Sequence, residues 1–266
     1  MITTTAPVFQ YLVGDCVDAL DAVWGHRIDI IDFETGVQLH SLEGHAEVVI
    51  NTFVSSDNKK VISVSKDGSV RYWDIETGEC TKILQDDKGF KSSDVTKDKK
   101  YIYTLGKDNT ILKWSIATGN KHIISLPEKE VDAIKISNLN KFILLYSEDL
   151  ISILSTDTGK VLYTINGELM GAGFDASFSY DDKYIIIEGY FGDIFVYNSN
   201  DGGLIWQLYN KGSEVRCNPV RNEFSYIGDT IGTAKIVPLQ ELINETEQRM
   251  SYRKLTQYEL QKYYLK

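Results

Sequence analysis

Residue types that cross-link small domains or bind metals are scarce in this chain of 266 residues, which has three cysteines, four histidines and four prolines. The cysteines are few, odd in number and far apart, and none belongs to a Cys-X-X-Cys pair; they are Cys16, Cys80 and Cys217. This pattern argues against a disulfide framework and against a cysteine-rich zinc site. We expect free thiols, buried or half-buried, in a reducing compartment.

Long apolar runs are also absent. No stretch approaches the roughly 18 apolar residues that a membrane-spanning helix needs. The first residues, MITTTAPVFQYLVGDC, have neither the basic start nor the long apolar centre of a secretory signal. We therefore expect no signal peptide, no membrane contact and a cytoplasmic protein.

Catalytic signatures are missing as well. The sequence contains no Gly-X-Ser-X-Gly elbow, no Walker loop and no His-Glu-X-X-His pair. The four histidines have no metal-ligand spacing; they are His26, His40, His45 and His122. Many acidic residues fall in turns, where local backbone hydrogen bonding explains an Asp. We expect no enzyme activity, no metal and no cofactor.

The net charge is −10, from 38 acidic and 28 basic side chains, and it is unevenly distributed. Residues 246–266 carry five basic and two acidic side chains, which makes this segment +3 and leaves −13 on residues 1–245. An acidic body repels phosphate backbones, so we expect no direct binding of nucleic acid by that body. Its charge favours basic protein partners or serves solubility alone.

What the chain does have is a repeat, seen best in Lys60–Leu84, KVISVSKDGSVRYWDIETGECTKIL. Apolar side chains alternate in two runs, and Asp67-Gly68 between them supplies the positive φ of a tight hairpin. The stretch therefore predicts a small antiparallel meander. A unit this short cannot bury its own apolar faces, so copies are expected beside it.

The copies are marked by a turn that follows a β-rich run. It recurs at intervals of 42, 41, 40 and 43 residues, as Thr35-Gly36, Thr77-Gly78, Thr118-Gly119, Thr158-Gly159 and Asp201-Gly202. The hairpin turn recurs too, because Asp67 and Asp108 each stand eleven residues before the Gly of their repeat, and Glu148 takes that place in the next copy. A period of 40–45 residues with four strands per unit indicates a propeller.

The second copy has further motifs, Glu43-Gly44-His45 before its first strand and Tyr72-Trp73-Asp74 at the end of its third. With these motifs the chain resembles the WD-repeat family over roughly residues 8–238. In that family a loop His, a second-strand Ser or Thr, a turn Asp and the Trp form a buried hydrogen-bonded set. The resemblance implies this structural role for His45, Ser63 or Ser65, Asp67 and Trp73. The third copy keeps Asp108 and Trp114 but has no Gly-His.

We predict an all-β chain, a β-propeller of six four-stranded WD-like blades over residues 1–238 (seven blades are possible), with a C-terminal α-helix over 239–266. Two repeats, 157–165 and 200–208, also resemble quinoprotein-type propellers, which are usually larger, eight-bladed and exported. Blade one is expected to use the strands Val8–Val13, Asp18–Trp24, Ile28–Phe33 and Val37–Leu42. Blade six shows no fourth strand, so either Ile2–Thr5 pairs as the closing strand, or a partner completes the ring, or the ring is held in another way.

The resemblance implies a non-catalytic interaction scaffold, a subunit of a larger protein assembly that presents propeller-face loops to its partners. The side chains expected at the partner face are Trp24, Phe90, Met170, Tyr190 and Phe191. The C-terminal helix either packs on the propeller or engages a partner. The alternative is an acidic inhibitor or immunity-type protein that blocks a basic toxin or a nucleic-acid enzyme.

Overall fold

The computed structural model describes residues 11–15, 26–32, 35–125, 127, 129–147, 150–166, 175–189, 193–208, 213–217, 223–227 and 231–235. The regular structure in these ranges consists of strands alone, so none of it is a helix that could span a membrane. The helix predicted for 239–266 lies outside the described residues.

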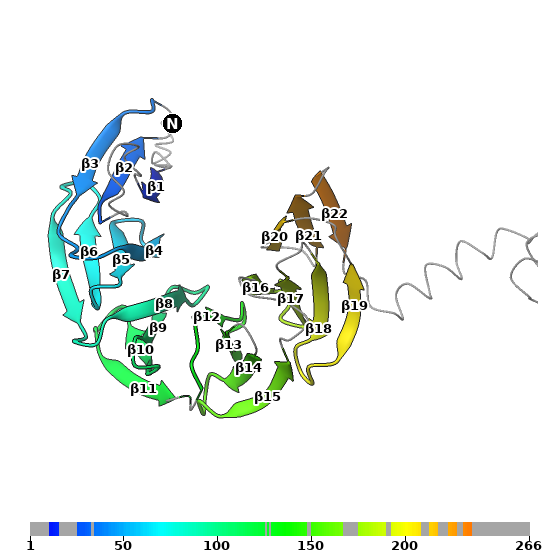
Figure 1. The fold of residues 1–266 in the computed structure, drawn as a ribbon. Helices are drawn as coiled ribbons and strands as arrows, with labels where there is room; N and C mark the ends of the chain where they lie inside the picture. Colours follow the sequence, from blue (N-terminus) through cyan, green and yellow to red (C-terminus); the bar gives the residue numbers. More distant parts are fainter. Residues whose placement is uncertain are drawn as a thin grey trace, which may run out of the picture.

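Six antiparallel sheets, the blades, follow one another along an arc (Figure 1). Within each blade the strands pair in chain order, with the first strand innermost and the last outermost. Blades two to five have four strands each, whereas the described parts of blades one and six have three. The all-β fold of WD-like blades is therefore confirmed.

The strands of blades one to three are β1 (Tyr11–Asp15), β2 (Ile28–Asp32), β3 (Gln38–Leu42), β4 (Val49–Val54), β5 (Lys60–Ser65), β6 (Ser69–Asp74), β7 (Cys80–Gln85), β8 (Phe90–Val95), β9 (Tyr101–Gly106), β10 (Ile111–Ser115) and β11 (Lys121–Ser125). Those of blades four to six are β12 (Ala133–Ile136), β13 (Phe142–Tyr146), β14 (Leu150–Ser155), β15 (Val161–Asn166), β16 (Asp175–Phe178), β17 (Tyr184–Glu188), β18 (Ile194–Asn198), β19 (Leu204–Leu208), β20 (Ser213–Cys217), β21 (Glu223–Ile227) and β22 (Ile231–Lys235).

Blade one differs from the prediction in its strand order. Strand β1 pairs directly with β2, from Tyr11 opposite Asp32 to Asp15 opposite Ile28, and β3 pairs with the other edge of β2. Both edges of β2 are therefore occupied by β1 and β3, so the predicted strand order is wrong; Asp18–Trp24 itself lies outside the described residues. The sequence predicted strands at Val8–Val13 and at Asp18–Trp24, and apolar alternation does not say which of the two pairs with β2. The structure shows that it is the first, as β1.

The recurring glycine turn has the same geometry in five blades. The glycines adopt φ of 67° to 81°, a region that residues with a Cβ rarely enter. Each glycine N–H donates to the carbonyl four residues earlier, at distances of 2.7 to 2.9 Å. That earlier residue also accepts hydrogen bonds from the turn through its own side chain; in chain order it is Asp32, Asp74, Ser115, Ser155 or Asn198.

The hydrophobic core lies between blades rather than within them. Each of the four core clusters combines one face of a blade with the facing side of the next. Between blades two and three, for example, Tyr72 packs with Phe90 and Trp114, while the neighbouring Trp73 points the other way into the cluster shared with blade one. Because successive side chains of a strand alternate faces, one blade contributes to two clusters.

Side-chain hydrogen bonds to backbone also join neighbouring blades. The Asp94 carboxylate on β8 accepts the Ile136 N–H on β12 at 2.7 Å. Asp182, in the β16–β17 turn, accepts the N–H groups of Asn138 and Leu139 from blade four, both at 2.7 Å. These bonds fix the relative positions of adjacent sheets.

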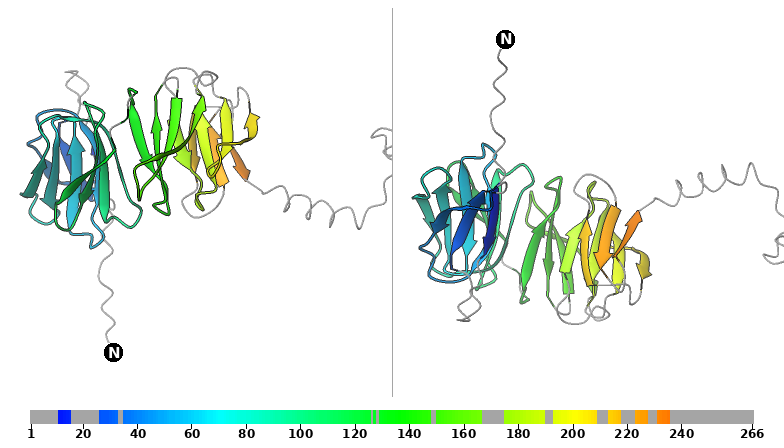
Figure 2. Two further views of the ribbon diagram at one scale, coloured as in Figure 1. Left: turned by 90° about the horizontal axis from the view of Figure 1, so that it is seen from below. Right: turned by 90° about the horizontal axis from the view of Figure 1, so that it is seen from above.

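The turns gather at the two ends of the strands (Figure 2). We call the strands of a blade a to d from the inside outward. The end that carries the b–c turns and the d–a connections is the top face, and the end that carries the a–b and c–d turns is the bottom face.

Candidate functional site

The top of blade two holds a continuous chain of side-chain hydrogen bonds. Trp73 Nε1 donates to Ser63 Oγ at 2.8 Å, and Ser63 Oγ lies 2.7 Å from His45 Nε2. His45 Nδ1 in turn lies 3.0 Å from Asp67 Oδ2. The structure thus brings together four residues that lie in a d–a connection, in strand b, in the b–c turn and in strand c.

Asp67 is the acceptor at the end of this chain. Its carboxylate also accepts the Ala46 N–H at 2.9 Å and the N–H and hydroxyl of Ser69 at 2.7 and 2.6 Å. Burial alone would raise its pKa, but these hydrogen bonds, with that from His45, lower the pKa to about 2. The carboxylate therefore stays ionised at any physiological pH.

Burial lowers the pKa of His45 below its usual value of 6.5, although Asp67 opposes this shift. The ring is therefore neutral at pH 7 and carries one proton. With the proton on Nδ1, the ring donates to Asp67 and accepts the Ser63 hydroxyl on Nε2, and Ser63 in turn accepts the Trp73 N–H. Every polar atom in the chain then has a partner.

A serine, a histidine and an aspartate in this order also occur in hydrolases, where the serine oxygen attacks a carbonyl. Here Ser63 is fully buried, and its oxygen already accepts the Trp73 N–H. A substrate carbonyl cannot approach that oxygen. The arrangement stabilises the b–c hairpin and its connection and offers no exposed nucleophile.

Blade three contains part of the same set. Trp114 Nε1 donates to Thr104 Oγ1 at 2.9 Å, as Trp73 does to Ser63. Asp108 accepts the N–H and hydroxyl of Thr110 at 3.0 and 2.8 Å. Its carboxylate also accepts a hydrogen bond at 2.5 Å from the ammonium of Lys88, which lies in the preceding d–a connection. The Lys88 ammonium is the main cause that lowers the pKa of Asp108 to about 2. In this blade an exposed ion pair therefore stands where blade two has a buried histidine.

Two further ion pairs tie the top loops of different blades together. Lys107, in the b–c turn of blade three, contacts the Glu47 carboxylate at 3.0 and 3.2 Å. Lys91 contacts Glu130, which precedes blade four, at 3.0 Å and the Asn109 side chain at 3.2 Å. Exposed pairs of this kind contribute little stability, so they join neighbouring loops only weakly.

Of the side chains predicted for partner contact, one, Phe90, belongs to the described residues. Phe90 is fully buried and packs edge-on against Trp114, with ring centroids 6.2 Å apart, so the prediction that it is exposed is wrong. As the first residue of β8 it points into the cluster between blades two and three. The other four, Trp24, Met170, Tyr190 and Phe191, lie outside the described residues.

The sequence did not lead us to two members of these hydrogen-bonded sets. Ser69 bonds both Asp67 and His45, and Thr104 takes the place of Ser63 in blade three. Thr104 stands 41 residues after Ser63, so the repeat spacing would have identified it. The one cysteine whose side chain is described, Cys80, is exposed rather than buried or half-buried. Within the described ranges no three His, Cys, Asp or Glu side chains gather as a metal site would require.

Comparison with known proteins identifies one stretch of the chain, which runs from blade one into blade two. The family model "WD domain, G-beta repeat" matches residues 36–74. Zinc finger CCCH domain-containing protein 17 of Oryza sativa subsp. japonica is 35% identical over 29% of this chain and 18% of its own length. Small ribosomal subunit protein RACK1 of Candida albicans is 37% identical over 19% of this chain and 16% of its own.

F-box/WD repeat-containing protein 10 of Mus musculus is 34% identical over 31% of this chain and 8% of its own length. The chain thus spans less than a fifth of the length of each of these relatives. The matches cover 51 to 82 residues of this chain, which is between one and two repeats and not a whole protein. Residues 36–74 match the WD repeat and the same turns and sheets recur along the arc, so the chain contains a WD repeat within a series of similar blades.

Proposed function

We propose that the protein is a non-catalytic interaction scaffold, a cytoplasmic subunit of a larger protein assembly that presents its propeller-face loops to partners. The observation that carries this proposal is the fixed arrangement of the top loops. The buried chain from Trp73 to Asp67 holds the d–a connection and the b–c turn of blade two in one geometry, and the ion pair between Lys107 and Glu47 joins this connection to the b–c turn of blade three. A surface that is already ordered loses little conformational entropy when a partner binds.

Within this proposal, the turn at Tyr190-Phe191 in blade five is the contact point. Aromatic side chains are enriched among the residues that dominate binding energy at interfaces. Trp24 and Met170 belong to the same proposed face, and residues 239–266 form a second one.

The test is capture of partners from native lysate with the full chain and with the double variant Tyr190→Ala/Phe191→Ala, followed by mass spectrometry. Tyr180→Ala is the matched control, because Tyr180 is an exposed aromatic of the same blade in a bottom-face turn. We expect several subunits of one assembly to be captured by the parent chain and the control, and some of them to be lost by the double variant. Equal capture by all three chains would contradict the proposed contact point.

The net charge of −10 supports a second candidate, an acidic inhibitor of one basic protein. The same capture experiment distinguishes the inhibitor from the scaffold. An inhibitor would yield a single basic partner whose association rate falls steeply with salt, because electrostatic steering is screened. A scaffold would yield several partners with a weak salt dependence.

A further inference from the structure

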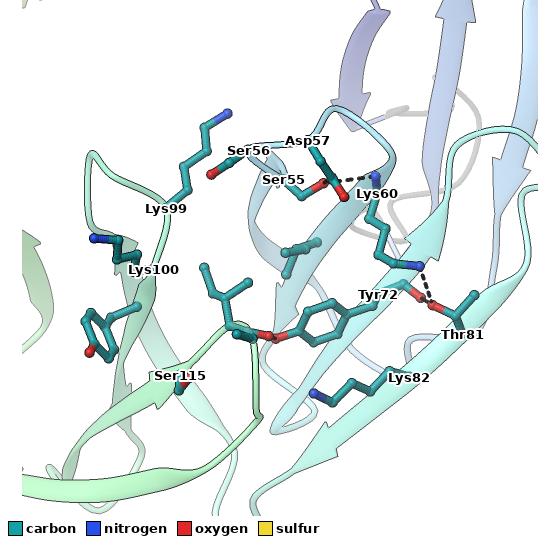
Figure 3. Close-up of a pocket in the computed structure, with 14 residues that line it drawn as sticks. Ser55, Ser56, Asp57, Lys60, Tyr72, Thr81, Lys82, Lys99, Lys100 and Ser115 are labelled. Atoms are coloured by element: carbon teal, nitrogen blue, oxygen red, sulfur yellow. Dashed lines mark hydrogen bonds between the residues drawn. The ribbon is translucent and has the colours of Figure 1, made fainter.

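A cleft of about 740 Å³ opens on the bottom face between blades two and three (Figure 3). Its walls are the a–b turns of the two blades, the c–d turn of blade three and strand β7. The floor is apolar: Ile62 and Tyr72 are buried within it, and the half-buried Ile116 and the exposed Tyr101 supply the apolar surface that a ligand can contact. The Tyr72 hydroxyl donates to the Ile116 carbonyl at 3.1 Å and so closes the floor between the blades.

Four lysines surround this floor, as Figure 3 shows: Lys60, Lys82, Lys99 and Lys100. Lys60 Nζ lies 3.3 Å from the Thr81 hydroxyl, and Lys82 lies 5.0 Å from the Tyr72 ring centre. Within the described structure, Lys100 pairs with Asp98 at 3.4 Å, whereas Lys60, Lys82 and Lys99 have no carboxylate within 4 Å.

The one carboxylate that lines the cleft, Asp57, is engaged by its own turn. It accepts the Ser55 hydroxyl at 2.6 Å and the Lys59 N–H at 3.1 Å. These bonds lower its pKa. Asp57 therefore stays ionised and offsets part of the positive charge of the cleft, but it forms no ion pair with any of the four lysines.

The surrounding blades have the opposite charge to the rest of the chain. Residues 49–125, which make up blades two and three, carry thirteen Lys and Arg against ten Asp and Glu, a net charge of +3 in a chain of −10. Lysines without carboxylate partners around an apolar floor are complementary to a ligand that combines negative charge with an apolar side chain. We propose that this cleft binds an acidic peptide segment of a partner protein, with an aliphatic residue between its carboxylates.

Nucleic acid fits this cleft less well. Binding of single strands relies on exposed aromatic faces on which bases stack. Tyr72 is buried under Lys82, and the Tyr101 ring is faced by Lys113 at 4.3 Å. The acidic remainder of the chain would also repel a long polyanion. An acidic peptide needs only the local positive charge and the apolar floor.

The test is fluorescence anisotropy of the full chain with a labelled peptide Glu-Glu-Leu-Glu-Glu. Lys82→Glu/Lys99→Glu reverses two charges in the cleft, and Lys141→Glu/Lys160→Glu makes the same change on exposed lysines in bottom-face turns of blade four. We expect the cleft variant to bind about tenfold more weakly or worse, a loss of about 1.4 kcal/mol. The control should bind within about twofold of the parent, and circular dichroism should show both variants folded.

Peptide analogues probe the two parts of the recognition. We expect weaker binding when Gln replaces each Glu, because charge is lost, and when Ser replaces Leu, because the apolar contact is lost. No binding by the parent chain, equal loss in both variants, or tighter binding of a labelled oligothymidylate would each overturn the proposal. The outcome is independent of the top-face contact proposed above, since Tyr190→Ala/Phe191→Ala should bind this peptide as the parent does.

Discussion

Ser63 is the residue on which the hydrogen-bond chain of blade two depends. Its hydroxyl serves Trp73 Nε1 and His45 Nε2, so Ser63→Ala leaves two buried polar atoms without a partner. An unsatisfied buried group costs about 1–3 kcal/mol, so we expect the free energy of unfolding to fall by about 2–4 kcal/mol. Urea unfolding, followed by Trp fluorescence, measures this loss of stability.

The matched variant is Thr104→Val in blade three, which removes the hydroxyl at nearly constant volume and leaves one donor, Trp114 Nε1, unpaired. We expect a loss of about 1–2 kcal/mol, smaller than that of Ser63→Ala. An equal or larger loss in Thr104→Val would contradict the central position of Ser63.

The buried neutral His45 makes stability depend on pH. Because its folded-state pKa is lowered, the unfolded chain binds a proton below about pH 6.5 that the folded chain does not. His45 therefore leaves the free energy of unfolding unchanged well above pH 6.5 and lowers it progressively as the pH falls below that value. Asp67 does not titrate in this window, because its pKa is about 2.

His45→Gln should remove this dependence. We expect the stability difference between the parent and His45→Gln to shrink steadily as the pH is lowered from about 7.5 to about 5, as measured by urea unfolding at each pH. The other histidines are common to both chains and cancel in the difference. A difference that grows on acidification would mean that the folded state favours the protonated ring.

At the scale of the element, the recurring glycine turn allows a matched comparison. Gly159 and Gly36 have φ of 67° and 69°, but a Cβ at Gly159 would stand 2.2 Å from the Ile124 carbonyl oxygen, whereas one at Gly36 meets nothing within 4 Å. Gly36→Ala should cost only the conformational penalty of about 1–2 kcal/mol. Gly159→Ala must also displace backbone, so we expect its loss of stability to exceed that of Gly36→Ala by at least about 1 kcal/mol.

Both variants are compared by urea unfolding against the parent chain. Similar losses would show that the backbone of β11 moves away freely from the turn of blade four. A larger loss in Gly36→Ala would contradict the packing described for these turns.

Strand β8 shows why a position in a blade does not by itself predict exposure. Phe90 was expected at the partner face because it opens the strand next to a top loop. Its side chain instead takes the face of β8 that meets blade two, where Tyr72 and Trp114 enclose it. Alternation places a side chain on one face or the other, and the neighbouring sheet determines whether that face is open.

At the scale of the whole molecule, Asp182 joins blades four and five. It is buried, and its two carboxylate oxygens accept the N–H groups of Asn138 and Leu139 across the blade boundary. Asp182→Ala leaves both amides unpaired, and we expect a loss of about 2–4 kcal/mol. Amide hydrogen exchange at Asn138 and Leu139 should accelerate more than exchange within β13.

The control is Asp57→Ala, which removes an aspartate from an a–b turn of blade two that bonds only within that turn in the described structure. We expect a loss below about 1 kcal/mol and unchanged exchange in blade four. If the two variants were equally destabilised, the hydrogen bonds of Asp182 between blades would contribute no more to stability than those of Asp57 within one turn.

The sequence by itself determined the repeat, because its signals are local. Alternation with a period of two marks a strand, and a glycine at positive φ marks a turn, so the strands of blades two to five and the five glycine turns were predictable from residues close in the chain. The members of the hydrogen-bond chain followed from the resemblance of those repeats to a known family, except for the choice between Ser63 and Ser65. The structure assigns that place to Ser63, since Ser65 bonds to the Glu47 carbonyl instead.

Only the tertiary structure decided which surfaces of different repeats meet. The hydroxyl of Tyr72 on the Ile116 carbonyl, the Asp182 carboxylate on blade four and the lysines around one apolar floor each join residues from separate repeats. No local pattern encodes such contacts, because they depend on how each twisted sheet packs on the next. The pairing of β1 with β2 and the burial of Phe90 depend on the same long-range packing.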